Sequence, residues 1–478
     1  MAARGSRVLT GKQVIIEAAK TKAGIVGFGM LIMLVVVVAI VPIYAPFDVV
    51  SAWNSRQPWL DNPKVAAPEW MDWFTSRDMA RSLIVQQDDF TKSAGTNPEG
   101  TFKLITLRRT FEWNSDEFPS EVVVRLFAQW IDGTPPPRVK AIWLRPDGES
   151  LELFNLFPDR RVPDINVISI SQDAAVRETV RSWALGLGAE DQAFIQPGSV
   201  IFARADGEHA NNMLNTTSAA VLRGRYTLQL EAFAFDADDD VDSMFLAHGN
   251  IFGLVGTDQN RRDLFIGLLW GAPVALAFGT VAALLTVFSQ VLLGALGAFY
   301  GGRWDEFIQR AADFFLILPV LPILILIGAF YTPSIWIILG VVVIFSLVGG
   351  TTKVIRSIVL QVKEDQYIES ARSYGASRWR ILVRYILPRT LPYTFALIAL
   401  SVPAFIFLEA ALSFLGLGDP LLPTWGKILG DAQRSGAIFS GAWWWITFPA
   451  LGILFVTVGF AFLGYAFDKI LNPRLREE

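Results

Sequence analysis

Six long apolar runs constrain the fold of this chain more than any other feature of its sequence. A helix of about 20 apolar residues crosses the hydrocarbon of a bilayer and satisfies its own backbone polar groups there. The runs cover residues 23–47, 264–300, 307–331, 335–360, 391–415 and 444–467. Because 52% of the 478 residues are hydrophobic and only 18% are charged, the sequence predicts an α-helical polytopic membrane protein with six transmembrane helices.

The positions of lysine and arginine predict the orientation of these spans, since cytoplasmic flanks carry an excess of positive charge. Residues 1–22 hold five basic side chains against Glu17 alone. We therefore expect a cytoplasmic N-terminus and, after six crossings, a cytoplasmic tail at residues 471–478. The arginine-rich segment 364–388 then lies inside as well. This pattern predicts a multi-pass protein of the plasma (inner) membrane.

The remaining composition excludes several kinds of site. The chain has no cysteine, which excludes disulfides and thiolate metal ligands. Its net charge of −4 gives no general attraction to nucleic acid. The acidic run "DADDDVD" lacks the glycine and the glutamate of a calcium-binding EF-hand loop, so we expect a solvated loop. The less favoured alternative is a calcium site at Asp236, Asp238 and Asp240.

A region of different composition, residues 48–255, separates the first two runs. Segments such as "TFKLITLRRTFEW" and "GRYTLQLEAFAFD" alternate apolar with polar residues, which is typical of half-buried strands. The stretch "SQDAAVRETVRSWALGLGAEDQ" instead favours helical or mixed structure. We expect an inserted, mainly β domain, β-sandwich-like and extracytoplasmic.

A polar elbow, "EDQYIESARSYGASRWRILVRYILPRTLP" at residues 364–392, lies between two apolar runs. Gly375 is suited to the left-handed conformation that ends a helix, and Ser377 is suited to capping a second one. Pro388 and Pro392 are expected to end that second helix before the next span. An amphipathic loop at the membrane interface is the alternative. The apolar side of the second helix is expected to contain Trp379, Leu382, Val383 and Ile386.

The elbow also carries a resemblance to a known family. Glu369-Ser-Ala, followed by Gly375 and then Leu387-Pro388, resembles the EAA loop of ABC importer permeases, with Tyr385 where isoleucine is usual. In that family the loop forms the coupling helices that dock into the ATPase subunit. The resemblance implies an ATPase-coupling site made of Glu369, Ser370, Ala371, Gly375, Arg378, Leu387 and Pro388.

Two further motifs resemble the dipeptide, oligopeptide and nickel permeases of the DppC/OppC type. The first is "GTDQNRRDL" at residues 256–264, in which Arg261 stands where the family usually has glycine. The second is "LEAALSFLGLGDPLLPTWGKIL" at residues 408–429. The resemblance implies the type I ABC importer permease fold. It also implies structural roles for Gly256, Thr257, Asp258, Arg262, Asp263, Gly416, Gly418, Trp425 and Gly426.

The short stretch "APEW" at residues 67–70 resembles the approach that leads straight to the "GTD" motif in this family. About residues 74–247 are therefore expected to be an insertion. The expected order is a cytoplasmic segment 1–22, a first transmembrane helix 23–47, an extracytoplasmic β-rich domain 48–255, a permease core 256–470 with a coupling loop at 364–388, and a cytoplasmic tail 471–478.

The resemblance further implies a non-catalytic permease subunit. Its expected partners are a second, DppB/OppB-like permease subunit, two ABC ATPase subunits, an extracytoplasmic solute-binding protein and membrane lipid. ATP and magnesium belong to the ATPase subunits, so no cofactor is expected on this chain. Such systems import peptides, oligosaccharides or nickel chelates by alternating access, and we expect peptides or related solutes.

Two acidic side chains inside the apolar runs are further candidates, because a carboxylate is costly there. Glu409, with Ser413 one turn later, either lines the translocation path or caps a neighbouring backbone group. Asp313 is expected to pair with Arg310 on the same helix. The alternatives from other classes are an ion-coupled secondary transporter, which needs more intramembrane carboxylates, and a membrane-anchored receptor, which needs fewer spans.

Overall fold

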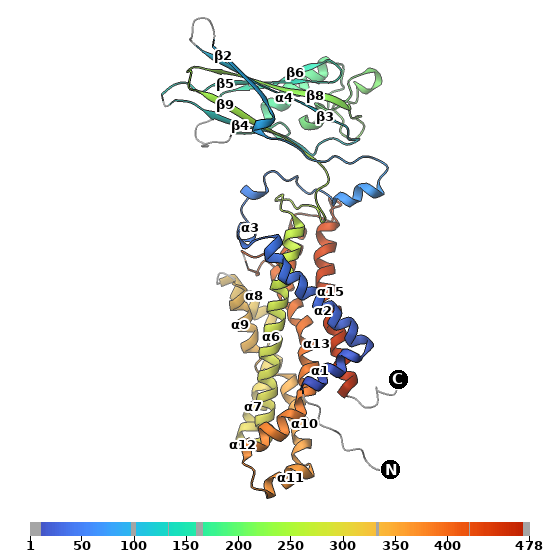
Figure 1. Ribbon diagram of the computed structural model, residues 1–478, viewed down its shortest axis with the longest axis vertical. Helices are drawn as coiled ribbons and strands as arrows, with labels where there is room; N and C mark the ends of the chain where they lie inside the picture. The colour runs from blue at the N-terminus through green and yellow to red at the C-terminus, as the bar shows by residue number, and fades with distance from the viewer. Residues whose placement is uncertain are drawn as a thin grey trace. The chain divides into compact units, whose positions relative to one another are not determined.

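The computed structural model describes residues 11–96, 102–131, 133–158, 166–330, 334–419 and 421–471. The chain divides into two compact units (Figure 1). A helical unit consists of Met1–Asn54 and Phe265–Glu478, and a β-rich unit consists of Ser55–Leu264. The first ten residues and the predicted tail after Leu471 lie outside the described residues.

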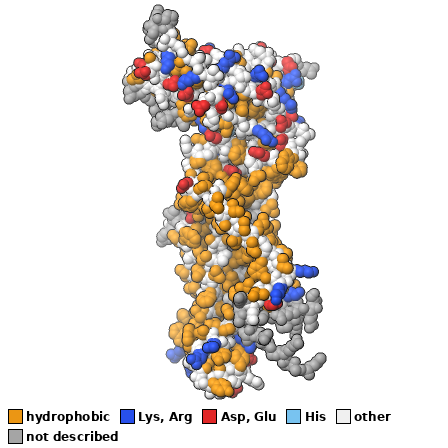
Figure 2. All heavy atoms as spheres, in the orientation of Figure 1, with side chains coloured by type: hydrophobic (Ala, Val, Ile, Leu, Met, Phe, Trp, Pro, Cys, Tyr) orange, Lys and Arg blue, Asp and Glu red, His pale blue; other side chains and the backbone are white. Residues whose placement is uncertain are grey.

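The helical unit has four described segments that are long and apolar enough to cross a membrane by themselves. They are α2 (Lys22–Tyr44), α6 (Leu264–Tyr300), the continuous run Arg378–Phe414, and α15 (Trp444–Leu471). Two pairs of consecutive helices, α7 with α8 and α9 with α10, are long and apolar enough only when each pair is taken as one span. The helices of these pairs are bent against each other by 71° and 42°. Hydrophobic side chains cover most of the visible surface of this unit (Figure 2). The prediction of long apolar helices is confirmed.

The other helices of this unit are α1 (Gly11–Lys20), α3 (Phe47–Ser51), α7 (Gly302–Ile317), α8 (Val320–Phe330), α9 (Ile335–Phe345), α10 (Gly350–Lys363), α11 (Gln366–Ser373), α12 (Arg378–Ile381), α13 (Leu387–Phe414) and α14 (Trp425–Arg434). Helix α15 packs against both α2 and α13. Buried residues of α1, α2, α6, α13, α14 and α15 form one apolar cluster, which positions the spans against each other.

The break between α7 and α8 falls inside the apolar run 307–331, which was predicted to be one span. Leu318, which follows α7, has an extended ψ of 128°. The residue before a proline avoids the helical conformation because the proline ring crowds its backbone. Pro319 therefore ends α7, and the chain turns before α8 begins at Val320.

The β-rich unit contains two antiparallel sheets, with strand orders β1-β9-β4-β7 and β2-β3-β8-β5-β6. Strands β3 and β8 alternate buried and more exposed residues over most of their length, as the sequence predicts. The strands are β1 (Leu83–Val85), β2 (Thr91–Thr96), β3 (Lys103–Trp113), β4 (Glu121–Gln129), β5 (Arg138–Leu144), β6 (Ser150–Leu156), β7 (Asn166–Ser169), β8 (Gly224–Ala234) and β9 (Asp240–His248).

The inner faces of the two sheets share one apolar core. Phe111 of β3 stacks on Phe245 of β9, with 5.2 Å between ring centroids. Trp143 of β5 and Tyr226 of β8 lie next to them, 5.4 Å apart. Aromatic pairs at such distances add to the stability that burial provides. Helices α4 (Ala174–Gly186) and α5 (Pro197–Val200) add Val176, Val180, Ala184 and Val200 to the core.

The chain enters and leaves the β-rich sheets at neighbouring points. The Ala67 amide donates to the Asn250 carbonyl at 2.8 Å, and the Phe252 amide donates back to Ala67 at 2.7 Å. Further into the unit, the Gly249 amide donates to the Ser82 hydroxyl at 2.9 Å. The two ends of the sheet region are therefore held side by side by backbone hydrogen bonds.

Candidate functional site

The elbow after α10 has the predicted helix–turn–helix conformation. Helix α11 ends at a turn in which Gly375 takes a φ of 76°. The Ala376 amide donates to the Ala371 carbonyl at 3.0 Å, so one of the last carbonyls of α11 is satisfied. The Ser377 hydroxyl accepts from the Arg380 amide at 3.3 Å and caps the second helix. A side chain at Gly375 would meet no atom within 4 Å, so this glycine is required by conformation and not by space.

The expectation that Pro388 and Pro392 end this second helix is wrong. Helix α12 continues through a π-helical turn, Leu382–Ile386, into α13, and the run is helical as far as Phe414. The Leu387 amide donates to the carbonyl of Leu382, five residues back. A proline has no amide to donate, and its ring crowds the preceding turn. The wider π turn directly before Pro388 makes room for that ring, so the helix continues.

The π turn also changes which side chains are buried. Leu382 and Ile386 are buried as expected, but Trp379 is 60% exposed and Val383 is 43% exposed. Ile381 is buried in their place. Residues four to five apart share a face in a π turn, so the regular helical spacing used for the prediction does not hold here.

The buried side of the elbow packs against the helical unit. Ile368 and Ala371 of α11 join Ile381, Leu382 and Ile386 in a cluster with residues of α6 and α10. The opposite side carries polar and aromatic groups, with Tyr374 91% exposed. Of the predicted coupling residues, Glu369, Ser370, Gly375 and Arg378 are exposed, Ala371 is buried, and Leu387 and Pro388 are half-buried. The elbow is thus fixed on one side and open on the other.

Two ion pairs join α10, which leads into the elbow, to α7. Arg356 binds Asp305 through two parallel contacts, Nε to Oδ1 at 2.7 Å and Nη2 to Oδ2 at 2.7 Å. Lys353, one turn earlier, pairs with Asp313. The prediction that Asp313 pairs with Arg310 is therefore wrong. The sequence does contain a signal for the pairing of Asp313 with α10. The two basic residues of α10 are one turn apart, which places both on the face toward α7.

Arg310 instead pairs with Glu306, one turn earlier on α7, at 2.6 Å. This side-chain pair is well exposed, with 78% of the arginine and 60% of the glutamate accessible. The i,i+4 spacing on α7 thus satisfies Arg310 locally, and Asp313 turns toward the neighbouring helix.

The second family motif surrounds the start of α14. The Trp425 indole donates to the Leu268 carbonyl at 2.8 Å. Its ring fills the space above two glycines, because a Cβ at Gly271 would lie 2.3 Å from it and one at Gly452 would lie 3.0 Å from it. A Cβ at Gly426 would lie 2.4 Å from the Ala410 carbonyl oxygen. The motif thus holds α14 tightly against α6, α13 and α15.

The other glycines of this motif also have local causes. Gly416 takes a φ of 85°, a left-handed conformation after α13. A Cβ at Gly418 would lie 2.1 Å from the Ser413 hydroxyl. Ser413 donates to Glu409 Oε1 at 2.6 Å, and both side chains are buried within this chain. A role of Glu409 and Ser413 in the translocation path stays a prediction.

The first family motif forms a closed turn before α6. Gly256 takes a φ of 83°, and Thr257 and Asp263 form an isolated antiparallel bridge. The buried Asp258 carboxylate accepts from Arg262 Nε at 2.5 Å. The Thr257 hydroxyl donates to the Pro63 carbonyl at 2.8 Å. These contacts join the turn to the segment that leaves the first span.

Arg261, which stands where the family pattern usually has glycine, takes a backbone conformation that glycine adopts more easily than other residues. Its φ is 66°, a left-handed value that is unusual for a residue with a side chain. The guanidinium donates to the Asn62 carbonyl at 2.5 Å and pairs with the largely buried Glu121 of β4. The side-chain contacts offset the cost of the strained backbone.

The acidic run is occupied by internal contacts. Lys92 of β2 pairs with Asp240 at 2.8 Å and with Asp242 at 2.7 Å. Asp239 is fully buried and accepts backbone amides of Ile131 and Phe235. Within the described part of the chain, no three acidic or histidine side chains are grouped to hold a metal ion. The residue that organises this loop is Asp239, which the sequence does not distinguish from its neighbours.

Comparison with known proteins identifies the family of this chain. Residues 290–477 match the family described as binding-protein-dependent transport system inner membrane component. The chain is 34% identical over 222 residues to the dipeptide transport system permease protein DppC of Bacillus subtilis, covering 46% of this chain and 68% of the relative. The chain belongs to this family of transport permeases.

Other permeases agree over similar lengths. The oligopeptide transport system permease protein OppC of Bacillus subtilis is 32% identical over 223 residues, which is 46% of this chain and 72% of the relative. The glutathione transport system permease protein GsiD of Pectobacterium atrosepticum is 32% identical over 267 residues, covering 54% and 87%. The protein is thus a multi-pass inner-membrane permease subunit of an ABC importer. Such permeases work with a partner permease, ATPase subunits and a substrate-binding protein.

Proposed function

We propose that this permease translocates peptides delivered by a solute-binding protein, driven by two ATPase subunits that grip the elbow. The observation that supports the coupling role is that one side of the elbow is buried against the helical unit while the other side is exposed. Ile368 and Ala371 anchor it to α6 and α10, while Glu369 and Arg378 face outward. Glu369 is suited to charge-assisted hydrogen bonds with a partner, and a rigid elbow transmits a push to the spans.

The coupling role is tested by two substitutions at one position. Gly375→Arg places a long charged side chain in the open space beside the left-handed turn. Gly375→Asn is the matched control, because asparagine tolerates the left-handed conformation and stays short. We expect Gly375→Arg to abolish co-purification of the ATPase subunits and Gly375→Asn to retain most of it. Equal recovery with both variants would refute docking at the elbow.

The proposed topology has six spans, formed by the four long helices and the two bent pairs. The N-terminus and the elbow are cytoplasmic, and the two sheets form a sandwich-like extracytoplasmic domain. The absence of cysteine makes a clean test available. In right-side-out membranes, a Ser373→Cys variant should resist a membrane-impermeant thiol reagent, while Phe194→Cys in the β-rich unit should react. The opposite pattern would reverse the orientation.

Peptides are the proposed substrate because three related permeases carry the names of dipeptide, oligopeptide and glutathione transport systems. Oligosaccharides or nickel chelates would use the same mechanism. Selectivity in such a system depends on the solute-binding protein that delivers the cargo. Calorimetric titration of the cognate binding protein with di- to hexapeptides should show binding, and binding of sugars or nickel alone would overturn the peptide assignment.

We further propose that the β-rich domain is an insertion that receives the solute-binding protein. The adjacent positions of Ser82 and Gly249 support an insertion, because a short turn can join them. Replacing Leu83–His248 by a two-residue glycine turn should leave membrane insertion intact and lower both uptake and binding-protein affinity. Wild-type uptake and affinity after this replacement would refute the receiving role.

A further inference from the structure

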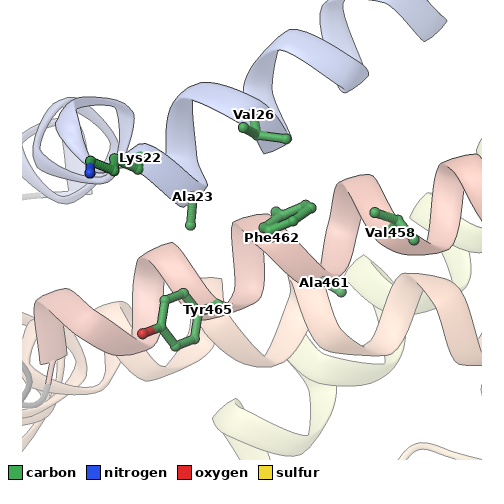
Figure 3. Close-up of a pocket in the computed structure, with 7 residues that line it drawn as sticks. All are labelled: Lys22, Ala23, Val26, Val458, Ala461, Phe462 and Tyr465. Atoms are coloured by element: carbon green, nitrogen blue, oxygen red, sulfur yellow. The ribbon is translucent and has the colours of Figure 1, made fainter.

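A hollow lies between the first and last long helices of the helical unit. Its volume is about 620 Å³. We call it the α2–α15 groove, and Figure 3 shows its lining residues. They are Lys22, Ala23 and Val26 of α2, and Val458, Ala461, Phe462 and Tyr465 of α15.

The groove lies beside a place where the two helices touch closely. A Cβ at Gly27 would lie 2.9 Å from the Leu463 side chain and 3.0 Å from the Gly459 carbonyl oxygen. Beside this contact the lining contains small residues, Ala23 and Ala461, which leave space. The four α15 residues of the groove have the spacing of a single helical stripe. The hollow is therefore a built feature of this helix pair.

The groove is polar at one end and apolar along the rest. Lys22 and Tyr465 lie together at one end, with the ammonium and the hydroxyl pointing the same way (Figure 3). The rest of the lining is hydrocarbon, with Val26 45% and Phe462 39% exposed. This polarity matches a ligand that has an anionic head and a hydrocarbon tail.

Lys22 is available for such a head. It is exposed, and the described residues offer it no ion pair, whereas Lys20 two residues earlier pairs with Glu17 at 2.8 Å. A lysine at the end of a membrane helix extends its ammonium toward the interface, where lipid phosphates lie. The tyrosine hydroxyl of Tyr465 supplies a second donor at the same level.

We propose that the α2–α15 groove binds one phospholipid, with its phosphate on Lys22 and Tyr465 and one acyl chain along Val26, Phe462 and Val458. The length of the groove favours a lipid over a helix of another protein. From residue 458 to residue 465 a helix rises about 10 Å. This is shorter than one leaflet of a hydrocarbon core about 30 Å thick. A partner helix would need a contact that continues across both leaflets.

The first test uses the unaltered importer complex. It is reconstituted in bilayers of phosphatidylethanolamine and phosphatidylglycerol that contain phosphatidylglycerol with a diazirine on one acyl chain. After irradiation, mass spectrometry should find the lipid on peptides that contain Val26, Val458 or Phe462. Labelling spread evenly over α2 and α15 would overturn the proposal, and so would protection of the groove by a peptide of another subunit.

The second test measures the head contact with matched variants. One lysine near an anionic surface contributes about a fivefold change in binding. Native mass spectrometry of the complex should therefore show Lys22→Gln retaining about fivefold less phosphatidylglycerol, and Lys20→Gln retaining the wild-type amount. Ala461→Phe should displace the acyl chain by filling the hollow. Equal retention by all three variants would overturn the proposal.

Discussion

The guanidinium of Arg356 and the carboxylate of Asp305 form a two-contact ion pair that joins α10 to α7. Both helices belong to the bent pairs, and α10 leads directly into the elbow. The Asp305 side chain is 14% exposed and the Arg356 side chain 34%. The neighbouring Lys353 and Asp313 side chains are more exposed, at 41% and 58%. The two pairs therefore offer a matched comparison of a sheltered and an open contact.

The sheltered pair should show a measurable coupling energy. In a double-mutant cycle with Arg356→Ala and Asp305→Ala, we expect about 1 kcal/mol in the free energy of unfolding. The same cycle at Lys353 and Asp313 should give less than half of that value. Arg356→Lys should lose most of the coupling, because an ammonium cannot make two parallel contacts. Thermal unfolding of the detergent-solubilised protein measures both cycles, and equal coupling energies would contradict this ranking.

The close packing of the Trp425 ring on Gly271 predicts that a side chain at Gly271 would clash with the ring. Gly271→Ala should lower the free energy of unfolding by about 1–3 kcal/mol, because the new methyl group would meet the indole ring. Gly340→Ala is the control, since a Cβ there meets no atom within 4 Å. Adding Trp425→Leu should recover part of the loss in Gly271→Ala. A Gly271→Ala protein as stable as the control would show that the ring is not held above the glycine.

Arg261 combines a strained backbone with a buried ion pair, and substitutions separate the two effects. Both Arg261→Ala and Arg261→Gly leave Glu121 without its main partner, which should destabilise the β-rich unit by about 3 kcal/mol. The glycine variant should be more stable than the alanine variant by about 1 kcal/mol, since only alanine retains the strain at positive φ. Chemical unfolding followed by tryptophan fluorescence compares them. Identical unfolding midpoints of the alanine and glycine variants would contradict the prediction, because they would show that the alanine variant does not retain backbone strain.

His248 should make the β-rich unit sensitive to acid. Burial lowers the pKa of His248 from 6.5 to about 3, and Arg261, Arg125 and Lys64 add repulsion. Its two ring nitrogens have no hydrogen-bond partner among the described residues. The unfolded chain binds a proton below pH 6.5 that the folded chain rejects, so stability is full above pH 6.5 and falls toward pH 3.

As the pH falls, the free energy of unfolding is expected to decrease by about 1.4 kcal/mol per pH unit, or by about 2 kcal/mol between pH 6.5 and pH 5. Scanning calorimetry of the full chain at these two pH values measures it. In His248→Phe, which cannot take up a proton, the change with pH should be smaller by about this amount. If the variant and the wild type lose stability in parallel, other groups cause the acid sensitivity.

Local sequence patterns predicted the elements whose causes lie within a few residues. Apolar length indicated the membrane helices, and strand alternation indicated β3 and β8. Gly375 and Ser377 indicated the turn and the cap of the elbow, because left-handed backbone and helix caps depend on the residue itself. The helical part of the β-rich region was also indicated, and α4 begins where the Asp173 side chain accepts two backbone amides.

Features that depend on distant residues or on unusual helix geometry were not predictable in the same way. The partner of Asp313 is 40 residues away on another helix, and no pattern within α7 indicates it. The π turn before Pro388 replaces a helix end that the proline alone would indicate. The space that the Trp425 ring fills is left by glycines of α6 and α15, which are adjacent only in the folded protein. The break at Pro319 had a local signal in the proline itself, whereas the one-turn spacing of Lys353 and Arg356 indicates a shared helix face without naming the partner helix.

The backbone hydrogen bond between Ala67 and Asn250 holds the two ends of the β-rich region side by side. A segment whose two ends emerge together can be exchanged without changing how far apart the flanking spans must sit. A fluorescent or enzymatic reporter with neighbouring termini could therefore be spliced between Ser82 and Gly249. Such an exchange would alter the β-rich region alone and leave the membrane helices as they are.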